Sequence, residues 1–139
     1  MAQATTWHDR TLGLLRIVTA LIFLLHGTIK ALHWPAPQPE LLAMLTPGSL
    51  MWWSGILEVI MGPLLLLGLA TRPVAFLASG EMAVGYFAIH APLSFWPAQN
   101  DGDAAILYTF VFLYIAIAGP GAFALDHLIP WRRLLRRDA

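Results

Sequence analysis

The chain has 139 residues, of which 58% are hydrophobic and 12% charged, with no cysteine and a formal net charge of zero. A soluble domain is nearer half apolar and a quarter charged, so this composition indicates an integral membrane protein. The chain has no basic stripe with interleaved aromatic residues, which argues against nucleic acid as a partner, and the lack of cysteine excludes disulfides and thiolate metal sites. The length suits a single domain that covers residues 1–139.

Four segments are long and apolar enough to cross a bilayer, which takes roughly 20 helical residues. In chain order they cover residues 11–32, 49–70, 73–93 and 104–125. Pro73 suits the first turn of the third helix, where the missing N–H is no loss. We therefore predict an all-α membrane protein that forms a bundle of four transmembrane helices.

Basic residues predict the orientation of these spans. Arg10, Arg72 and the run WRRLLRR at 131–137 would lie on one side of the membrane, whereas the connections 33–48 and 94–103 contain no Lys or Arg. Cytoplasmic loops are enriched in Lys and Arg. We therefore expect cytoplasmic N and C termini and a multi-pass protein of the cytoplasmic membrane.

Ionisable residues interrupt the apolar spans, and each should face the bundle and find a partner, because a charge facing lipid is costly. They are Arg16, His26, Lys30, Glu58, Glu81 and His90. The first three share one face of the first helix. Gly55 and Gly62 flank Glu58 on the second helix, and small residues there should let a neighbouring helix approach closely.

Depth in the membrane, at about 1.5 Å per helical residue, suggests which groups meet. His26, Lys30 and Glu58 fall in the outer half and should form a cluster. Arg16 and Glu81 fall in the inner half and should form a structural ion pair. The alternative for all these charges is that they fix the register of the bundle and carry no chemistry.

His26 and Glu58 are the candidate catalytic residues, since a histidine and a carboxyl group in an apolar setting suit proton transfer. Lys30, His90 and Trp96 are candidate ligand contacts, although His90 and Trp96 also fit ordinary interfacial positions. No metal-ligand spacing is present, so we expect no metal site. HExxH, P-loop and dinucleotide-binding motifs are absent as well.

Four stretches in order carry a resemblance to a known family: LRI, HGTIK, GILEVIMGPLLLLGLATRPVA and NDGDAAILYTFVFLYIAIAGPGAFALD. With these, the chain resembles the DoxX family of small four-helix membrane proteins within the broader DoxD-like group, from Arg16 to about Asp126. One departure is Asp103, where the family pattern has Glu at the start of the last helix. The charge is kept, so the match is little weakened.

The resemblance implies a subunit associated with a membrane oxidoreductase system, because some DoxX relatives are linked to thiosulfate:quinone oxidoreductase or to oxidative and sulfur stress. No cofactor would be covalently bound, and the ligand would be a quinone or a small sulfur oxyanion near Lys30. Oxidoreductase subunits would be the protein partners. Two alternatives stay open: a transporter or proton/anion permeation protein, which would need a homo-oligomer, and a scaffold subunit without catalysis.

Overall fold

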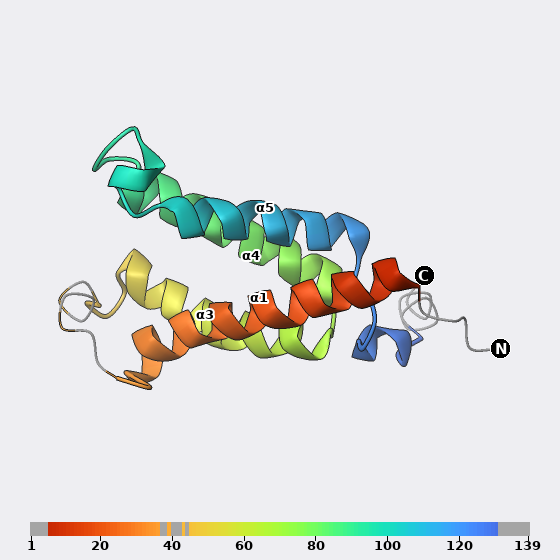
Figure 1. Cartoon of the computed structure of the whole chain (residues 1–139). Coiled ribbons are helices and arrows are strands. Elements are labelled where there is room, and N and C mark those ends of the chain that lie inside the picture. Colours follow the sequence, from red (N-terminus) through yellow and green to blue (C-terminus); the bar gives the residue numbers. More distant parts are fainter. Residues whose placement is uncertain (1–5, 37–38, 40–42, 44, 131–139) are drawn as a thin grey trace, which may run out of the picture.

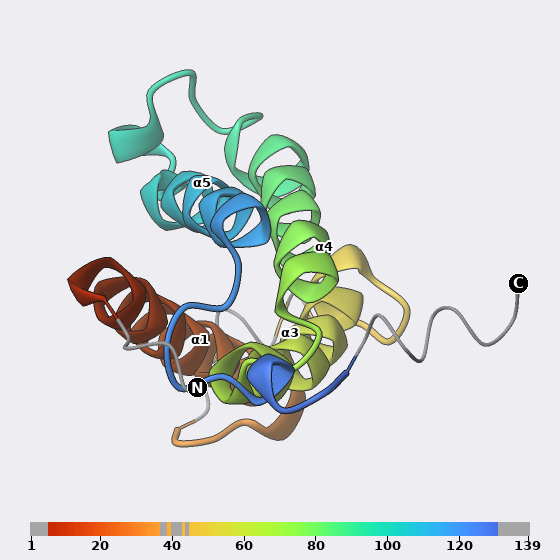
Figure 2. The same cartoon turned by 90° about the vertical axis from the view of Figure 1, so that its right-hand side faces the viewer.

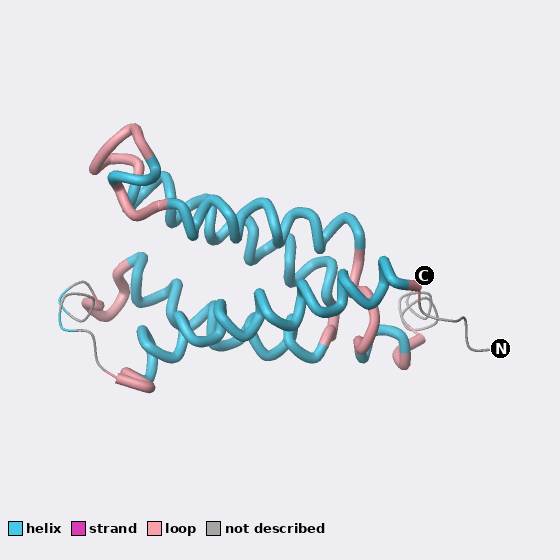
Figure 3. The backbone as a smooth tube through the Cα atoms, in the orientation of Figure 1, coloured by secondary structure: helices cyan, strands magenta, loops and turns pink. Residues whose placement is uncertain are grey.

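The computed structural model describes residues 6–36, 39, 43 and 45–130, and these residues form helices and loops without any strand (Figure 1 and Figure 3). The long helices among them are α1 (Trp7–Leu32), α3 (Leu50–Leu67), α4 (Thr71–Gly85) and α5 (Asp103–Ala118). A π-helical turn, η1 (Tyr86–His90), continues α4 directly, and the later loops contain the 3-10 turns η2 (Pro97–Gln99) and η3 (Leu125–His127). The all-α prediction is confirmed.

Local signals in the sequence set the ends of the first two long helices. Thr6 caps α1 in a capping box, in which its hydroxyl accepts from the backbone N–H of Asp9 and the Asp9 carboxylate accepts from the backbone N–H of Thr6. Ser49 caps α3 by accepting from the N–H of Trp52. Helix α3 ends at Gly68, whose φ of 67° is the left-handed conformation that glycine adopts readily.

The last long helix is shorter than the predicted span 104–125. Helix α5 ends at Ala118, because Gly119 has a φ of 104° and Pro120 cannot continue a helix. Its 16 residues rise about 24 Å, less than the hydrocarbon thickness of about 30 Å. The residues that follow cross the end of the bundle, from α5 past α1 to the end of α3 (Figure 2).

The helices are arranged as two pairs, α1 with α3 and α4 with α5 (Figure 1 and Figure 2). Glycine permits the close approach of the first pair. A Cβ atom on Gly27 would lie 2.7 Å from the Cβ of Glu58, and one on Gly55 would lie 2.7 Å from the Cβ of Lys30. The predicted close packing around Glu58 is therefore confirmed, and it brings the charged groups of α1 and α3 together.

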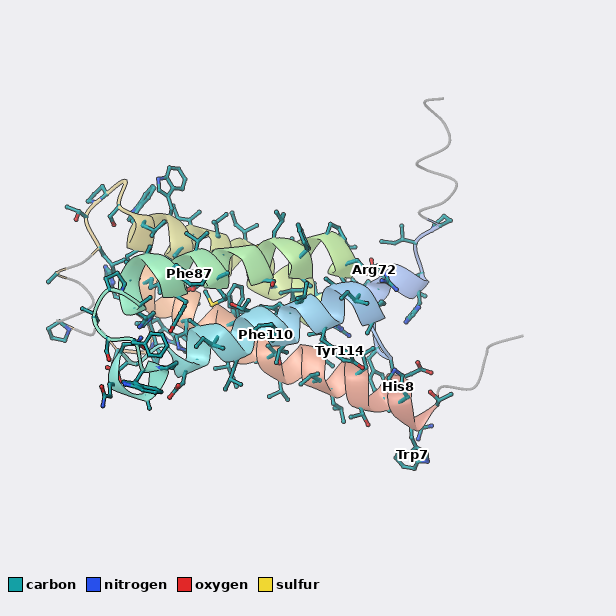
Figure 4. The ribbon with its side chains drawn as sticks, turned by 90° about the horizontal axis from the view of Figure 1, so that it is seen from above. Trp7, His8, Arg72, Phe87, Phe110 and Tyr114 are labelled. Carbon is teal, nitrogen blue, oxygen red and sulfur yellow. The ribbon has the colours of Figure 1, made fainter. Side chains whose placement is uncertain are left out.

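Apolar side chains fill the centre of the bundle and also cover its exterior. Phe23 of α1 and Phe112 of α5 are buried and meet edge to face, with ring centroids 4.9 Å apart. All four long helices expose large apolar side chains, among them Val18, Ile60, Phe76, Leu77, Phe110 and Ile117. Figure 4 shows Phe87 and Phe110 with their rings on the outer surface. So extensive an apolar exterior fits a lipid environment.

Length and composition mark α1 and α3, within the described residues, as helices that could cross a membrane. Helix α5 is apolar but shorter. The start of α1 and the 119–127 segment lie at one end of the bundle, here called the Arg16 end (Figure 1). The end of α1 and the start of α3 lie at the other, here called the 33–49 end (Figure 1). The basic run 131–137, which carried most of the predicted orientation, lies outside the described residues.

Candidate functional site

Arg16 is wholly buried, and its guanidinium group donates hydrogen bonds to five backbone carbonyls. The acceptors, at 2.6–3.1 Å, are Leu65 and Leu66 at the end of α3 and Pro120, Ala122 and Phe123 after α5. The expected Arg16–Glu81 ion pair is not formed, because every N–H of the guanidinium group is directed at one of these carbonyls. Arg16 thus holds the chain after α5 against the end of α3.

Two other charged residues secure the same end. The Asp126 carboxylate accepts from the backbone N–H groups of Ala70 at 2.7 Å and Thr71 at 2.8 Å, which caps the start of α4. Arg72 donates to the last carbonyls of α5, including Ala116 at 3.0 Å (Figure 4). Both arrangements satisfy helix termini and complement the helix dipole. The Arg16 end is therefore a structural junction.

Lys30 and Glu58 form an ion pair between α1 and α3. The Lys30 ammonium nitrogen lies 2.6 Å from Oε1 of Glu58, and the Glu58 side chain is only 1% exposed. Lys30 also donates to the hydroxyl of Ser54 at 2.8 Å, and that hydroxyl lies 3.2 Å from the same Glu58 oxygen. The sequence predicted the Lys30–Glu58 contact but missed Ser54, which lies one turn before Glu58 on the same face of α3.

Glu81 lies beside this pair. Both of its carboxylate oxygens are buried without a hydrogen-bond partner among the described residues, and so is Oε2 of Glu58. Glu81 is near enough to Glu58 and Lys30 to interact with them electrostatically, and the Ser54 hydroxyl is the donor nearest to it. Glu58 precedes the end of α3 by nine residues and Glu81 follows the start of α4 by ten. At about 1.5 Å per residue, the two carboxyl groups lie at nearly the same height.

A groove of about 670 Å³ opens beside this cluster between α3 and α4. Its walls are almost entirely apolar, with Leu57, Ile60 and Met61 on one side and Leu77 and Val84 on the other. Glu81 is its ionisable lining residue, and Ser54 adds a hydroxyl. The groove is thus an apolar site with one acidic group on its wall.

A second, smaller pocket of about 340 Å³ lies at the 33–49 end. Lys30, His33 and Trp52 contribute polar atoms to its wall, beside Leu45 and Ile56. Lys30 lines this pocket and also contacts Ser54, which lines the groove. The Lys30–Ser54 hydrogen bond therefore joins the wall of the pocket to the wall of the groove.

His26, the other candidate catalytic residue, is exposed on α1, although the sequence analysis expected it to face the bundle. Its Nδ1 lies 2.8 Å from the carbonyl oxygen of Ile22, and its ring meets Tyr108 of α5 edge to face at 6.0 Å. His26 and Tyr108 both lie within electrostatic reach of Glu58. A direct proton exchange between His26 and Glu58 stays a prediction, and Tyr108 is a neighbour that sequence reasoning missed because it gave no weight to hydroxyls within the spans.

Comparison of the sequence with models of known protein families gives one match. The model of the DoxX family matches residues 11–91. This chain belongs to the DoxX family. All six ionisable residues predicted within the spans lie inside the matched DoxX range.

Relatives of this DoxX protein are found in two bacteria. A Haemophilus influenzae protein described as uncharacterized is 40% identical over 125 residues, which cover 84% of this chain and 88% of the relative. The Escherichia coli "Inner membrane protein YqjF" is 27% identical over 118 residues, which cover 82% of this chain and 88% of that protein. No solved structure matches the chain. The family and these relatives identify a membrane protein.

The remaining predicted contacts of the DoxX chain, His90 and Trp96, lie away from the groove walls. Nδ1 of His90 lies 2.8 Å from the carbonyl oxygen of Asn100, and its ring stacks on Tyr86. Trp96 is 62% exposed and packs edge-on against Phe95. Both residues organise the loop between η1 and α5, and their role in ligand binding stays a prediction.

The chemistry available to the DoxX site follows from its charges. In the described part of the chain, no three His, Cys, Asp or Glu side chains gather as a metal site requires. The groove offers apolar surface, one carboxyl group and one hydroxyl. These groups can hold a mainly apolar molecule by its polar end and exchange a proton with it.

Proposed function

We propose that this DoxX protein binds the head group of a quinone in the groove between α3 and α4, as a subunit of a membrane oxidoreductase system. The observation that carries the proposal is the Glu81 carboxyl group, whose oxygens are buried on an apolar wall and have no hydrogen-bond partner among the described residues. An unpaired buried polar group costs about 1–3 kcal/mol. A ligand that pairs with Glu81 would recover this free energy.

Both parts of a quinone, the ring and the prenyl tail, suit this groove. Its ring carries oxygen atoms that can accept a hydrogen bond from a protonated carboxyl group, and its prenyl tail suits the apolar walls. The volume of about 670 Å³ lies within the usual range of ligand pockets, about 300–1,000 Å³. A sulfur oxyanion is disfavoured there, because the groove presents an acidic group and the nearby Lys30 is already paired with Glu58.

We further propose four membrane crossings in the cytoplasmic membrane with both termini in the cytoplasm. Helices α1 and α3 have the length and composition of spans. Helix α4 runs unbroken into η1, which extends it from Thr71 to His90, and α5 is apolar along its length. The exposed apolar side chains on α4 and α5 support contact with lipid. The relative YqjF, called an inner membrane protein, supports the same location.

The two alternative functions, a permeation protein and a scaffold subunit without catalysis, receive less support. Permeation through one copy of the chain would need a polar path, but the inner part of the bundle is filled by buried apolar residues such as Phe23, Leu65 and Phe112. The carbonyl contacts of Arg16 also hold the chain after α5 across the Arg16 end of the bundle. A scaffold without chemistry would have no use for the unpaired Glu81 carboxyl group.

Native mass spectrometry of protein released from its own membrane tests the proposal, together with a thermal titration. Wild-type protein should carry quinone, and added quinone should raise the melting temperature. A ligand at 100 times its dissociation constant stabilises the folded state by about 2.7 kcal/mol. Glu81→Gln should weaken the effect, whereas Asp103→Asn, an exposed acid outside the groove, should not. Wild-type protein that carries no quinone and shows no thermal shift would contradict the proposal.

A further inference from the structure

The charges at the centre of the bundle do not balance. Glu58 and Glu81 contribute two carboxyl groups, and Lys30 contributes one ammonium group, which contacts Glu58 and acts on Glu81 only electrostatically. Arg16 gives no compensation, because its donors are bound to carbonyls at the Arg16 end. With both carboxyl groups ionised, the centre of an apolar bundle would carry a net negative charge, which is costly.

The unpartnered oxygens show where a proton can be held. Glu58 is 1% exposed, yet its Oε2 has no partner within the described residues, and the same holds for both oxygens of Glu81. The titratable groups that face Glu58 from neighbouring helices are Lys30 and His26 of α1 and Tyr108 of α5. Within the described residues none of them donates a hydrogen bond to these three oxygens, and one proton shared between the carboxyl groups would pair two of them.

We propose that Glu58 and Glu81 share one exchangeable proton, which neutralises the cluster with Lys30 and enters through the pocket at the 33–49 end. Two carboxyl groups held close together in an apolar site commonly hold one proton between them, because both cannot ionise. The bound proton leaves Glu58 free to pair with Lys30. This proton site does not depend on which molecule occupies the groove.

Ser54 provides the route between the pocket and the carboxyl groups. Its hydroxyl lies 2.8 Å from Lys30, which lines the pocket, and 3.2 Å from Oε1 of Glu58. Ser54 also lines the groove beside Glu81. A hydroxyl both donates and accepts, so it can pass a proton between these groups. At the other end, the donors of Arg16 are bound to backbone carbonyls, which accept hydrogen bonds but have no proton to pass on.

Infrared difference spectroscopy on the full chain in lipid nanodiscs tests the proton site. Wild-type protein at neutral pH should show a carboxylic-acid C=O band that shifts on transfer to heavy water. Glu81→Gln should abolish the band, since Glu58 then pairs with Lys30 alone, and Glu81→Asp should retain it. The proposal is overturned if the wild type has no such band, if the band survives in Glu81→Gln, or if added sodium ions remove it at constant pH.

The rate at which the band shifts in heavy water tests the route. Ser54→Ala removes the hydroxyl and should slow the shift at least about tenfold, a change of about 1.4 kcal/mol in the barrier. Ser54→Thr keeps a hydroxyl and should exchange at close to the wild-type rate. An Ala variant as fast as the wild type would overturn entry through Ser54. Circular dichroism of each variant confirms that the fold is kept.

Discussion

The ammonium nitrogen of Lys30 lies 2.6 Å from Oε1 of Glu58, at a position where α1 and α3 approach so closely that glycine lies opposite each residue. Gly55 faces the Lys30 side chain and Gly27 faces that of Glu58. The short helix distance and the ion pair therefore depend on the same packing. The pair leaves Glu81 as the acid on the wall of the α3–α4 groove.

Loss of one partner of this pair should be strongly destabilising. Lys30→Met leaves a buried carboxylate without its counter-ion, which typically lowers the free energy of unfolding by about 3–5 kcal/mol. The double variant Lys30→Met/Glu58→Met removes both charges and should recover most of that loss. Unfolding midpoints in a mixed-micelle denaturant titration measure both effects. A single variant as stable as the wild type would show that the pair is not buried in the membrane protein.

The two glutamates should respond in opposite directions to the same substitution. Glu58→Gln leaves Lys30 buried without a counter-ion and should lower stability. Glu81→Gln removes an acid that forms no ion pair among the described residues, and the new amide can still donate to Glu58, so stability should be unchanged or rise by about 1–3 kcal/mol. The same denaturant titration, run without quinone, compares the two variants. Equal losses would mean that Glu81 has a structural partner.

The two arginines at the Arg16 end should also differ, although both donate to helix carbonyls. Arg16→Lys replaces a buried fork of five donors by a point charge with three, and the carbonyls left unpaired should cost at least about 3 kcal/mol. Arg72 is exposed, so water can replace its contacts and Arg72→Lys should cost about 1 kcal/mol or less. Similar losses for the two variants would argue against the clamp by Arg16.

Much of the bundle follows from the sequence because long apolar runs must form helices in lipid. The spans 11–32, 49–70 and 73–93 correspond to α1, α3 and α4 with η1 within a few residues. The Gly55–Glu58–Gly62 spacing indicated the close contact with α1. The last helix was predicted too long, although the Gly119–Pro120 pair gave a signal for its end.

The partners of the charged residues were harder to predict. The acceptors of Arg16 are backbone carbonyls, which have no signature in the sequence, so the prediction paired Arg16 with Glu81, the acid expected at a similar depth. The predicted depths of Glu58 and Glu81 in the membrane were counted from the expected ends of their helices. A shift of a few residues in those ends changes which groups meet. The groove itself arises from how α3 and α4 diverge, which side-chain periodicity does not specify.

Two glycines on different helices should show opposite effects of one added methyl group. Gly27→Ala places a Cβ 2.7 Å from the Glu58 Cβ and 2.8 Å from the Val59 nitrogen. The α1–α3 contact must then widen, and overpacking of this kind typically costs about 1–3 kcal/mol. A Cβ on Gly80 meets nothing within 4 Å, so Gly80→Ala should gain about 0.5–1 kcal/mol from helix propensity. Thermal unfolding distinguishes the two, and a stabilised Gly27→Ala variant would contradict the close packing.

Gly80 also permits the most direct test of quinone binding, because it lines the groove and has open space beside it. Gly80→Leu should fill the groove without a clash against the protein, and Gly80→Ala is the matched control that gains helix propensity but leaves the groove open. The measurement is the rise in melting temperature of each purified protein on addition of quinone. We predict a rise for the wild type and Gly80→Ala and none for Gly80→Leu; an equal rise in all three would contradict binding in the α3–α4 groove.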